Sequence, residues 1–328
     1  MGLDHRLSRL LARQRTYLQR EQPSVDAEAG LFRSGASSAV AQRGQSGRRC
    51  RPTEAKMKIQ PYERVEYRHN PLAEVLCQVR FPFDARLAEG IPENLAQALA
   101  QLGYTVRSEE QAFNISVALP VQDSDPLKTT REATQKIVHF SSMTELYKVS
   151  LSAEYVALTC TKYTAWADFL PKLLSAYRAV LGALGSVFPI RVGLRYKDVI
   201  SREREGLGLA GVPWSELIQP FLLGPLRDHA LSDAPEDKSM EEAVVGFVTQ
   251  STIRLAECGL VLQGALLRSV EDPSKTAFLI DSDFFAENDD PAVLDDESKL
   301  TTLLNVLHHN AGSLFERSIT RRLHAALK

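Results

Sequence analysis

The chain has 328 residues, of which 44% are hydrophobic and 24% charged, and these proportions are typical of a globular protein with a sizeable core. No apolar run approaches the roughly 20 residues that a membrane-spanning helix needs, and the four cysteines are too far apart for a closely spaced zinc or redox motif. The formal net charge of −2 combines +6 in residues 1–56 with −8 in the remainder, and such an acidic body argues against nonspecific binding to nucleic acid.

Residues 1–56 differ in composition from the rest of the chain, because they are rich in Arg, Gln, Ser and Gly. The leucines within 3–20 are compatible with a basic amphipathic helix, as in targeting or membrane-surface segments. The low content of large apolar residues instead favours a disordered or non-native extension ahead of Met57. We therefore predict this extension over 1–56, followed by two α+β halves over 57–186 and 187–328.

The first half begins with the most regular pattern of the chain. Period-two alternation predicts a strand over 72–81, with one apolar face and one face that mixes apolar and charged side chains. Pro92 suits the first position of a short helix that ends near Leu102. Apolar residues at helical spacing predict a long helix over 166–184. Between these helices we predict four strands, near residues 111–120, 135–141, 145–151 and 154–161.

The second half follows a similar order. Alternation predicts a strand over 189–200 that has its basic residues on one face and its apolar residues on the other. A short helical piece is expected near 213–223, and a sustained apolar stripe predicts a closing helix over 298–327. Between these helical segments we predict four more strands, near residues 243–250, 252–257, 259–268 and 276–285.

The predicted order of strand, helix, four strands and helix therefore occurs twice. This order predicts an α+β fold in which an antiparallel curved sheet packs against two long helices, with the two halves joined into one continuous sheet. The element order is similar to the duplicated saddle of TATA-box-binding proteins and to the helix-grip folds, which wrap a sheet around a long helix. A shared fold does not determine a shared function.

Four sequence motifs carry a more specific resemblance. They are NPLAEVLCQVRFP at 70–82, LRY at 194–196, FLIDSD at 278–283 and FERSIT at 315–320. Together they resemble an uncharacterised, sporadically distributed bacterial protein family with an NPLxEV strand near its start and an FExxIT helix near its end. The resemblance covers Met57 to the C-terminus. It implies a link to mobile genetic elements or defence and supplies no catalytic residues.

Charged side chains on three predicted strands form the candidate site. Alternation places two of them on the polar face of each strand, namely Glu74 and Arg80, Arg191 and Arg195, and Asp281 and Asp283. If these faces meet in one sheet, the six residues form a mixed-charge surface that can bind a polar ligand or a partner. The alternative is a set of self-compensating surface salt bridges, each contributing about 0–1 kcal/mol.

The sequence supports other kinds of site less strongly than it supports this mixed-charge surface. Asp281 and Asp283 leave the same face of a strand, and paired carboxylates suit Mg²⁺, but the spacing identifies no third ligand. His308 and His309 cannot share one helix face, and the apolar stripe beside His308 predicts a histidine at the edge of the core rather than a ligand. The chain contains no GxSxG, HExxH or GxxxxGK[ST] motif, which excludes the easily recognised hydrolases and NTPases.

These observations favour a non-catalytic binding or protein-interaction module without a cofactor, which binds a protein partner or a second copy of itself. One alternative is a metal-dependent enzyme acting on phosphoester or nucleic-acid substrates, with Asp281 and Asp283 as ligands. Another is a small-ligand sensor with a pocket between the sheet and the closing helix. Cys77 and Cys160 lie on apolar strand faces, and free buried thiols are typical of a cytoplasmic protein.

Overall fold

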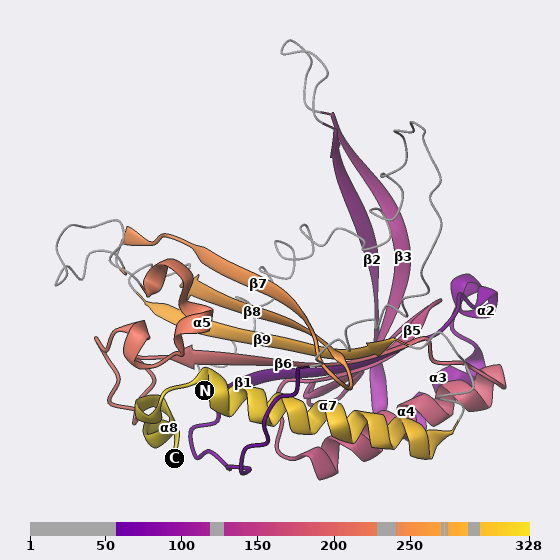
Figure 1. The fold of residues 1–328 in the computed structure, drawn as a ribbon. Coiled ribbons are helices and arrows are strands. Elements are labelled where there is room, and N and C mark those ends of the chain that lie inside the picture. The colour runs from indigo at the N-terminus through magenta and orange to yellow at the C-terminus, as the bar shows by residue number, and fades with distance from the viewer. Residues whose placement is uncertain are drawn as a thin grey trace, which may run out of the picture. The chain divides into compact units, whose positions relative to one another are not determined.

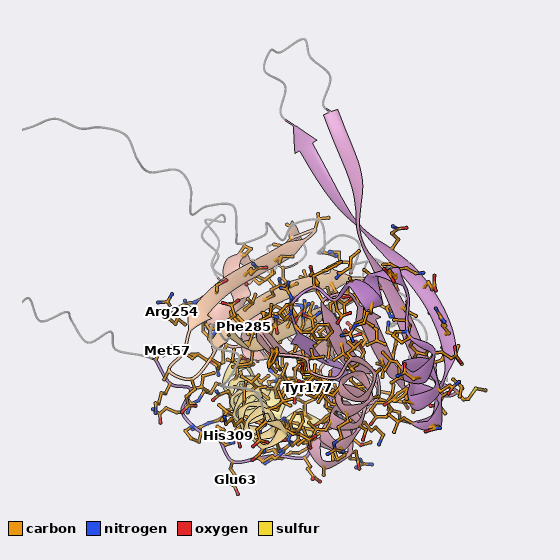
Figure 2. The ribbon with its side chains drawn as sticks, turned by 90° about the vertical axis from the view of Figure 1, so that its right-hand side faces the viewer. Met57, Glu63, Tyr177, Arg254, Phe285 and His309 are labelled. Carbon is orange, nitrogen blue, oxygen red and sulfur yellow. The ribbon has the colours of Figure 1, made fainter. Side chains whose placement is uncertain are left out.

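In the computed structural model, the chain divides into two compact units, of which the larger comprises Met57–Phe113 and Glu132–Lys328. The structure describes residues 57–118, 128–227, 243–269, 275–287 and 296–328, together with Glu241 and Asp272. The extension predicted over 1–56 lies outside the described residues. Met57 forms a parallel β-bridge with Leu255, the residue that directly follows Arg254 (Figure 2).

Nine strands form one antiparallel sheet in the order β2-β3-β4-β5-β1-β6-β9-β8-β7 (Figure 1). The strands are β1 Leu72–Arg80, β2 Tyr104–Ala118, β3 Lys128–Ser142, β4 Tyr147–Ser152, β5 Tyr155–Cys160, β6 Arg191–Ser201, β7 Phe247–Arg254, β8 Gly259–Arg268 and β9 Thr276–Glu287. The central strand is β1, in which Cys77 lies opposite Leu158 of β5 on one side and Leu194 of β6 on the other. The two predicted halves therefore contribute to one continuous sheet.

Helices α4 and α7 both lie on one side of the sheet (Figure 1). The helices are α2 Ala85–Glu89, α3 Glu93–Gln101, α4 Trp166–Leu184, α5 Pro220–Leu223, α7 Glu297–Ser318 and α8 Arg321–Leu327. The two long helices are antiparallel, because Trp166 contacts Asn305 whereas Arg178, further along α4, contacts Glu297 at the start of α7. None of the helices in the described ranges is long and apolar enough to cross a membrane.

The hydrophobic core lies between the sheet and these helices. From β1 it receives Val75, Cys77 and Val79, whose side chains are fully buried, as the alternation of that strand predicts. The apolar stripe of α4 is buried as well, and α4 has the bounds predicted from its periodicity. Cys77 and Cys160 are free, buried thiols, in agreement with their predicted positions on apolar strand faces.

The prediction of two strands over 243–250 and 252–257 is wrong. A single strand, β7, pairs with β8 without interruption from Phe247 opposite Leu266 to Arg254 opposite Gly259. Most of its side chains are exposed, so hydrogen bonding to β8 defines the strand and hydrophobic alternation does not. Between its helical segments the second half consequently has three strands, β7, β8 and β9, where four were predicted.

The prediction of one closing helix over 298–327 is also wrong. Helix α7 ends at Ser318, and Ile319 is extended, with φ −106° and ψ 157°. Ile319 forms a bridge with Ile218, and the Thr320 side chain then caps α8 by accepting a hydrogen bond from the Leu323 N–H at 3.4 Å. The apolar stripe continues across the break, which explains why periodicity alone predicts a single helix.

Candidate functional site

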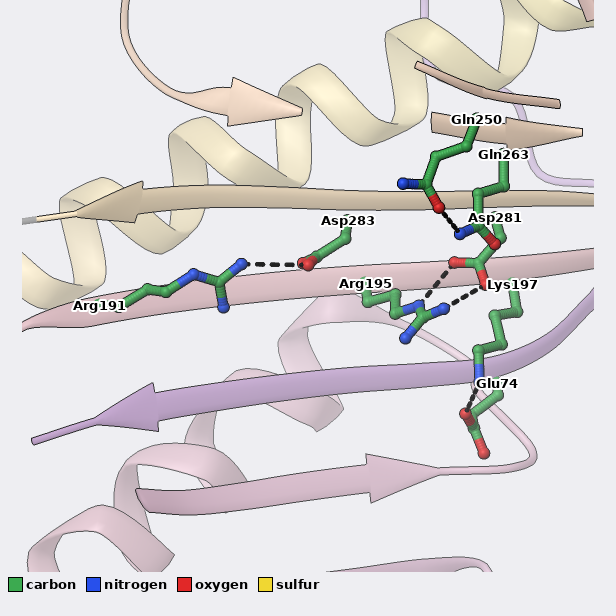
Figure 3. Close-up of polar contacts among 8 residues, drawn as sticks. All are labelled: Glu74, Arg191, Arg195, Lys197, Gln250, Gln263, Asp281 and Asp283. Atoms are coloured by element: carbon green, nitrogen blue, oxygen red, sulfur yellow. Dashed lines mark hydrogen bonds and ion pairs between the residues drawn. The ribbon is translucent and has the colours of Figure 1, made fainter. Parts of the chain in front are cut away.

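Three basic residues of β6 lie on the face of the sheet that is turned away from α7. Tyr196 of β6 points to the helices, because its hydroxyl contacts His308 of α7. Alternation therefore directs Arg191, Arg195 and Lys197 to the opposite face, and Figure 3 shows α7 on the far side of the sheet, behind its strands. We define the charged face as Glu74, Arg191, Arg195, Lys197, Gln250, Gln263, Asp281 and Asp283.

Three ion pairs connect the strands across the charged face (Figure 3). Arg195 lies directly opposite Asp283 in the β6–β9 register but reaches diagonally to Asp281. Its Nε and Nη2 donate to the two oxygens of that carboxylate at 2.7 and 2.6 Å. Arg191 Nη2 donates to Asp283 at 3.2 Å, and Lys197 Nζ donates to Glu74 of β1 at 2.7 Å.

These ion pairs are largely shielded from water. The Asp281 side chain is 2% exposed and that of Arg195 is 28% exposed. Burial alone lowers the pKa of Arg195, but the charge of Asp281 outweighs it and holds that pKa above its ordinary value. Burial raises the pKa of the Asp283 carboxyl, and the positive charges of Arg191 and Arg195 offset only part of this increase.

All six predicted site residues lie on the same face of the sheet, because Arg80 is directly opposite Arg191 in the β1–β6 register. Arg80 nevertheless does not join the three ion pairs. It is at the end of β1, and its guanidinium is 3.6 Å from Glu154 rather than paired with Glu74. The sequence patterns did not single out Lys197, Gln250 or Gln263 as site residues. The sequence signal that could have identified Gln263 is a polar residue within the otherwise apolar strand β8.

The charged face contains a buried acceptor without a hydrogen-bond partner among the described residues. Gln263 Nε2 donates to Gln250 at 2.5 Å, whereas Gln263 Oε1 is buried and unpaired. The same holds for the hydroxyl of Thr159 on β5, which lies on this face through the register of Leu76 with both Thr159 and Arg195. Each such atom destabilises the free protein by about 1–3 kcal/mol.

The chemistry of the charged face does not favour a metal ion. Across the described ranges, no group of three or more His, Cys, Asp and Glu side chains is placed to hold one. The carboxylates of Asp281 and Asp283 each face an arginine, which already supplies the positive charge that a cation would bring. The metal-dependent alternative therefore receives no support from the geometry of these two residues.

The segment just before the 70–82 motif contacts the 315–320 motif and α8. The Tyr67 hydroxyl is 2.7 Å from both carboxylate oxygens of Glu316 and 2.8 Å from Nδ1 of His324. Within the first motif, the Asn70 side chain accepts from the Leu72 N–H at 3.0 Å at the start of β1. Glu316 therefore has a structural role, because it holds the segment before β1 against α7 and α8.

Two comparisons with known proteins found no match. No model of a known protein family matches the chain, and no curated protein is similar enough to be counted as a match.

Proposed function

We propose that this chain is a non-catalytic binding module whose charged face binds another protein chain. The observation that carries the proposal is the unpaired Oε1 of Gln263, a residue that is 6% exposed and adjoins the buried Arg195–Asp281 pair. A buried acceptor of this kind is costly in the free protein. A partner that donates a hydrogen bond to it removes that cost on binding.

The neighbouring groups favour an amide as the partner group. Arg195 binds Asp281 through Nε and Nη2, and a guanidinium has five N–H donors, so the donors of Nη1 remain for a partner. Asp281 lies directly opposite Gln263 in the β8–β9 register. The charged face therefore offers a donor and an acceptor close together, and this pattern is complementary to a backbone amide or an Asn or Gln side chain.

Charge supports a protein partner over a nucleic acid. The described pairs match each basic side chain of the charged face with a carboxylate, as in Arg191 with Asp283 and Lys197 with Glu74. Such a surface provides no excess positive charge for a phosphate backbone. A second copy of the chain is as suitable a partner as a different protein, so the oligomeric state is part of the test.

We also make proposals about the family, the internal duplication and the cellular location of this protein. We propose that the chain belongs to the sporadically distributed bacterial family with NPLxEV and FExxIT motifs, with a role linked to mobile elements or defence. The adjacency of β1 and β6 at the centre of the sheet supports an internal duplication, with a saddle or helix-grip arrangement. Free thiols at Cys77, Cys160 and Cys258 support a reducing, cytoplasmic location.

The substitution Gln263→Leu tests the proposal. It removes the unpaired acceptor and keeps a side chain of similar size, and the one hydrogen bond that it breaks goes to Gln250, which is exposed, so the fold should be about as stable as the wild type. The wild-type and variant chains would be purified from the host under native conditions, with bound proteins quantified by mass spectrometry and homodimers by light scattering. We expect the variant to retain about tenfold less partner, or to form a correspondingly weaker dimer.

The matched control is Gln97→Leu on α3, where the wild-type side chain is exposed and donates only to Glu93 of the same helix. This control should bind the partner as the wild type does. A wild-type chain that remains monomeric and retains no protein at a defined stoichiometry would overturn the proposal. So would equal retention by the wild-type chain and Gln263→Leu.

A further inference from the structure

Strand β7 is the last strand of the sheet, so only one of its two sides pairs with another strand of the sheet (Figure 1). It pairs with β8 over its whole length of 8 residues, without a register shift. The unpaired side of an edge strand presents a row of backbone N–H and C=O groups, which form a template for pairing with another chain. The outer side of β7 is therefore a candidate interaction surface.

The turn between β7 and β8 identifies the residues whose backbone groups point outward. The Leu255 N–H donates to the Cys258 carbonyl at 2.9 Å, so the N–H of Leu255 points towards the chain that forms β8. The backbone groups of successive residues in an antiparallel strand point alternately to its two sides, and the register of β7 with β8 continues from this turn without interruption. The N–H and C=O groups of every second residue therefore point away from β8. These residues include Val248, Gln250 and Thr252.

The outer side already accepts another segment of the chain just beyond the end of β7. Met57 forms a parallel β-bridge with Leu255, and the Ala256 N–H donates to the Met57 carbonyl at 2.9 Å. Ala256 follows the same alternation as Thr252, so this hydrogen bond lies on the outer side of the edge. From Val248 to Thr252, the outward groups form no backbone hydrogen bond with any described residue. Among the described residues, nothing pairs with this part of the edge.

The side chains of β7 do not protect its edge. Residues 247–253 read FVTQSTI, without a charged residue, a proline or a glycine, and most of them are exposed. The Val248 side chain belongs to a residue that is 52% exposed. Natural edge strands are protected by lysine, proline, a β-bulge or an inward-pointing charge. An unprotected edge rich in β-branched residues is typical of a strand that pairs with another chain.

The opposite edge of the sheet differs from β7. Its outermost strand is β2, and residues 105–111 at the start of that strand are exposed. Three of these residues, Arg107, Glu109 and Glu110, are charged, and Arg107 Nη2 donates to Glu109 at 3.0 Å. Charges on an edge strand disfavour its pairing with another chain. The two edges are therefore unequal, and β7 is the one suited to pairing.

We propose that β7 is a dimerisation edge, at which the β7 strands of two copies of this chain pair antiparallel about a twofold axis and join their sheets. A twofold axis places the same edge on both sides of the contact, so each outward N–H meets an outward C=O of the second copy. With the axis beside Gln250, Val248 lies opposite Thr252 of the second copy, and these two β-branched side chains form a favourable cross-strand pair. No charge within residues 247–253 opposes the approach of an identical strand.

This contact goes beyond the proposed function and does not depend on it. It uses backbone groups of the sheet edge, whereas partner binding at the charged face uses the acceptor of Gln263 and the donors of Arg195. The charged face of each copy then remains available to a different protein.

The test measures the self-association of the full chain by sedimentation velocity at increasing concentrations, with hydrogen exchange of residues 247–254 followed in parallel. We expect a monomer–dimer equilibrium, and the exchange of the outward amides should slow as the dimer forms. Thr252→Pro removes an outward N–H and leaves the hydrogen bonds to β8 in place, because an edge strand tolerates proline where the nitrogen faces solvent. This change acts in both copies, so the dimer should be weakened by about tenfold or more.

A second variant keeps the backbone unchanged. Val248→Lys places a positive charge on the edge of each copy and should also weaken the dimer by about tenfold or more. It decides the outcome if Thr252→Pro lowers the melting temperature. Its matched control is Met143→Lys, which adds the same charge to a residue that is 77% exposed in the turn between β3 and β4. The control for the proline variant is Thr252→Val, which keeps the N–H and the β-branched shape. Both controls should dimerise as the wild type does.

A wild-type chain that remains monomeric at every concentration at which it dissolves would overturn the proposal. So would a dimer that Thr252→Pro and Val248→Lys both leave intact, or one that Thr252→Val weakens as much as Thr252→Pro does. Gln263→Leu should dimerise as the wild type does. A dimer that only Gln263→Leu dissociates would place the contact on the charged face, which contradicts this proposal and supports the proposed function. Failure of the proposed function alone would appear as unchanged partner retention by Gln263→Leu.

Discussion

The two faces of the sheet bury polar groups by different means. On the charged face, full charges compensate one another, as in the Arg195–Asp281 pair. On the helix side, neutral groups such as Tyr196 and His308 share hydrogen bonds among stacked rings. The two faces therefore differ in how strongly their stability should depend on breaking a single polar contact.

Two ion pairs of the same geometry provide the sharpest test of the difference in burial. Arg195 and Asp281 are joined by bonds of 2.7 and 2.6 Å, and Arg178 and Glu297 are joined by bonds of 2.7 and 2.6 Å as well. The second pair joins α4 to α7 and is more exposed, at 57% for the arginine and 36% for the glutamate. The two pairs share this hydrogen-bond geometry and differ strongly in burial.

The largest expected effect is that of Arg195→Ala. This change leaves the buried Asp281 carboxylate without its arginine, which should lower the free energy of unfolding by about 3–5 kcal/mol. Arg178→Ala breaks a solvated pair and should lower it far less. Urea unfolding of both variants measures the difference. Equal losses would mean that the charged face is as accessible to water as the surface between α4 and α7.

An intermediate effect on the free energy of unfolding is expected from Asp198. This residue lies two positions after Tyr196 on β6, so alternation places both side chains on the same face. Burial and, to a smaller extent, the charge of Asp281 together raise its pKa to about 8. The folded state therefore binds a proton that the unfolded state releases near the ordinary pKa of 3.8. The free energy of unfolding should fall as pH rises from about 4 to about 8, because the unfolded state then binds fewer protons than the folded state.

Asp198→Asn should flatten this dependence. Its advantage over the wild type should be absent near pH 4 and grow to at least about 1–3 kcal/mol at pH 8, where the wild type must bury a charge without a described partner. Denaturant unfolding at several pH values measures this trend. A wild-type stability that stays constant or rises over this window, with Asp198→Asn parallel to it, would contradict the assigned burial.

The smallest expected effect on stability comes from removing the unpaired atoms themselves. Gln263→Leu and Tyr163→Phe should each change the free energy of unfolding by about 1 kcal/mol or less, because neither breaks an ion pair and the hydrogen bond that Gln263→Leu removes goes to the exposed Gln250. Partner binding should be lost in Gln263→Leu and kept in Tyr163→Phe, because Tyr163 lies on the helix side of the sheet. Equal loss of partner binding in both variants would show that the two faces do not act independently.

Much of the fold could be predicted from the sequence, because local periodicity determines it. The bounds of α4, Trp166–Leu184, and the buried face of β1 follow from patterns of period 3.6 and 2. The break after Ser318 could not be predicted in this way, because the pairing of Ile319 with Ile218 depends on a segment about a hundred residues away. The same limit applies to β7, whose extent is set by its partner strand.

The candidate site was predicted in part for the same reason. Alternation correctly placed Glu74, Arg195 and Asp281 on polar strand faces, since successive side chains of a strand must point to opposite sides. It could not reveal that Arg195 passes over its direct neighbour to reach Asp281, or that Arg80 turns to Glu154. These choices depend on strand order and register.

By itself, the sequence of this protein determined which side chains share a face, because backbone geometry alone imposes the periods of strands and helices. Only the tertiary structure decided which charges meet and which buried atoms remain unpaired. The strands that carry Glu74, Arg195 and Asp281 lie far apart in the chain, and pairing across a sheet brings them together. The unpaired atoms at Gln263, Tyr163 and His308 became apparent only when every neighbouring donor and acceptor had been located.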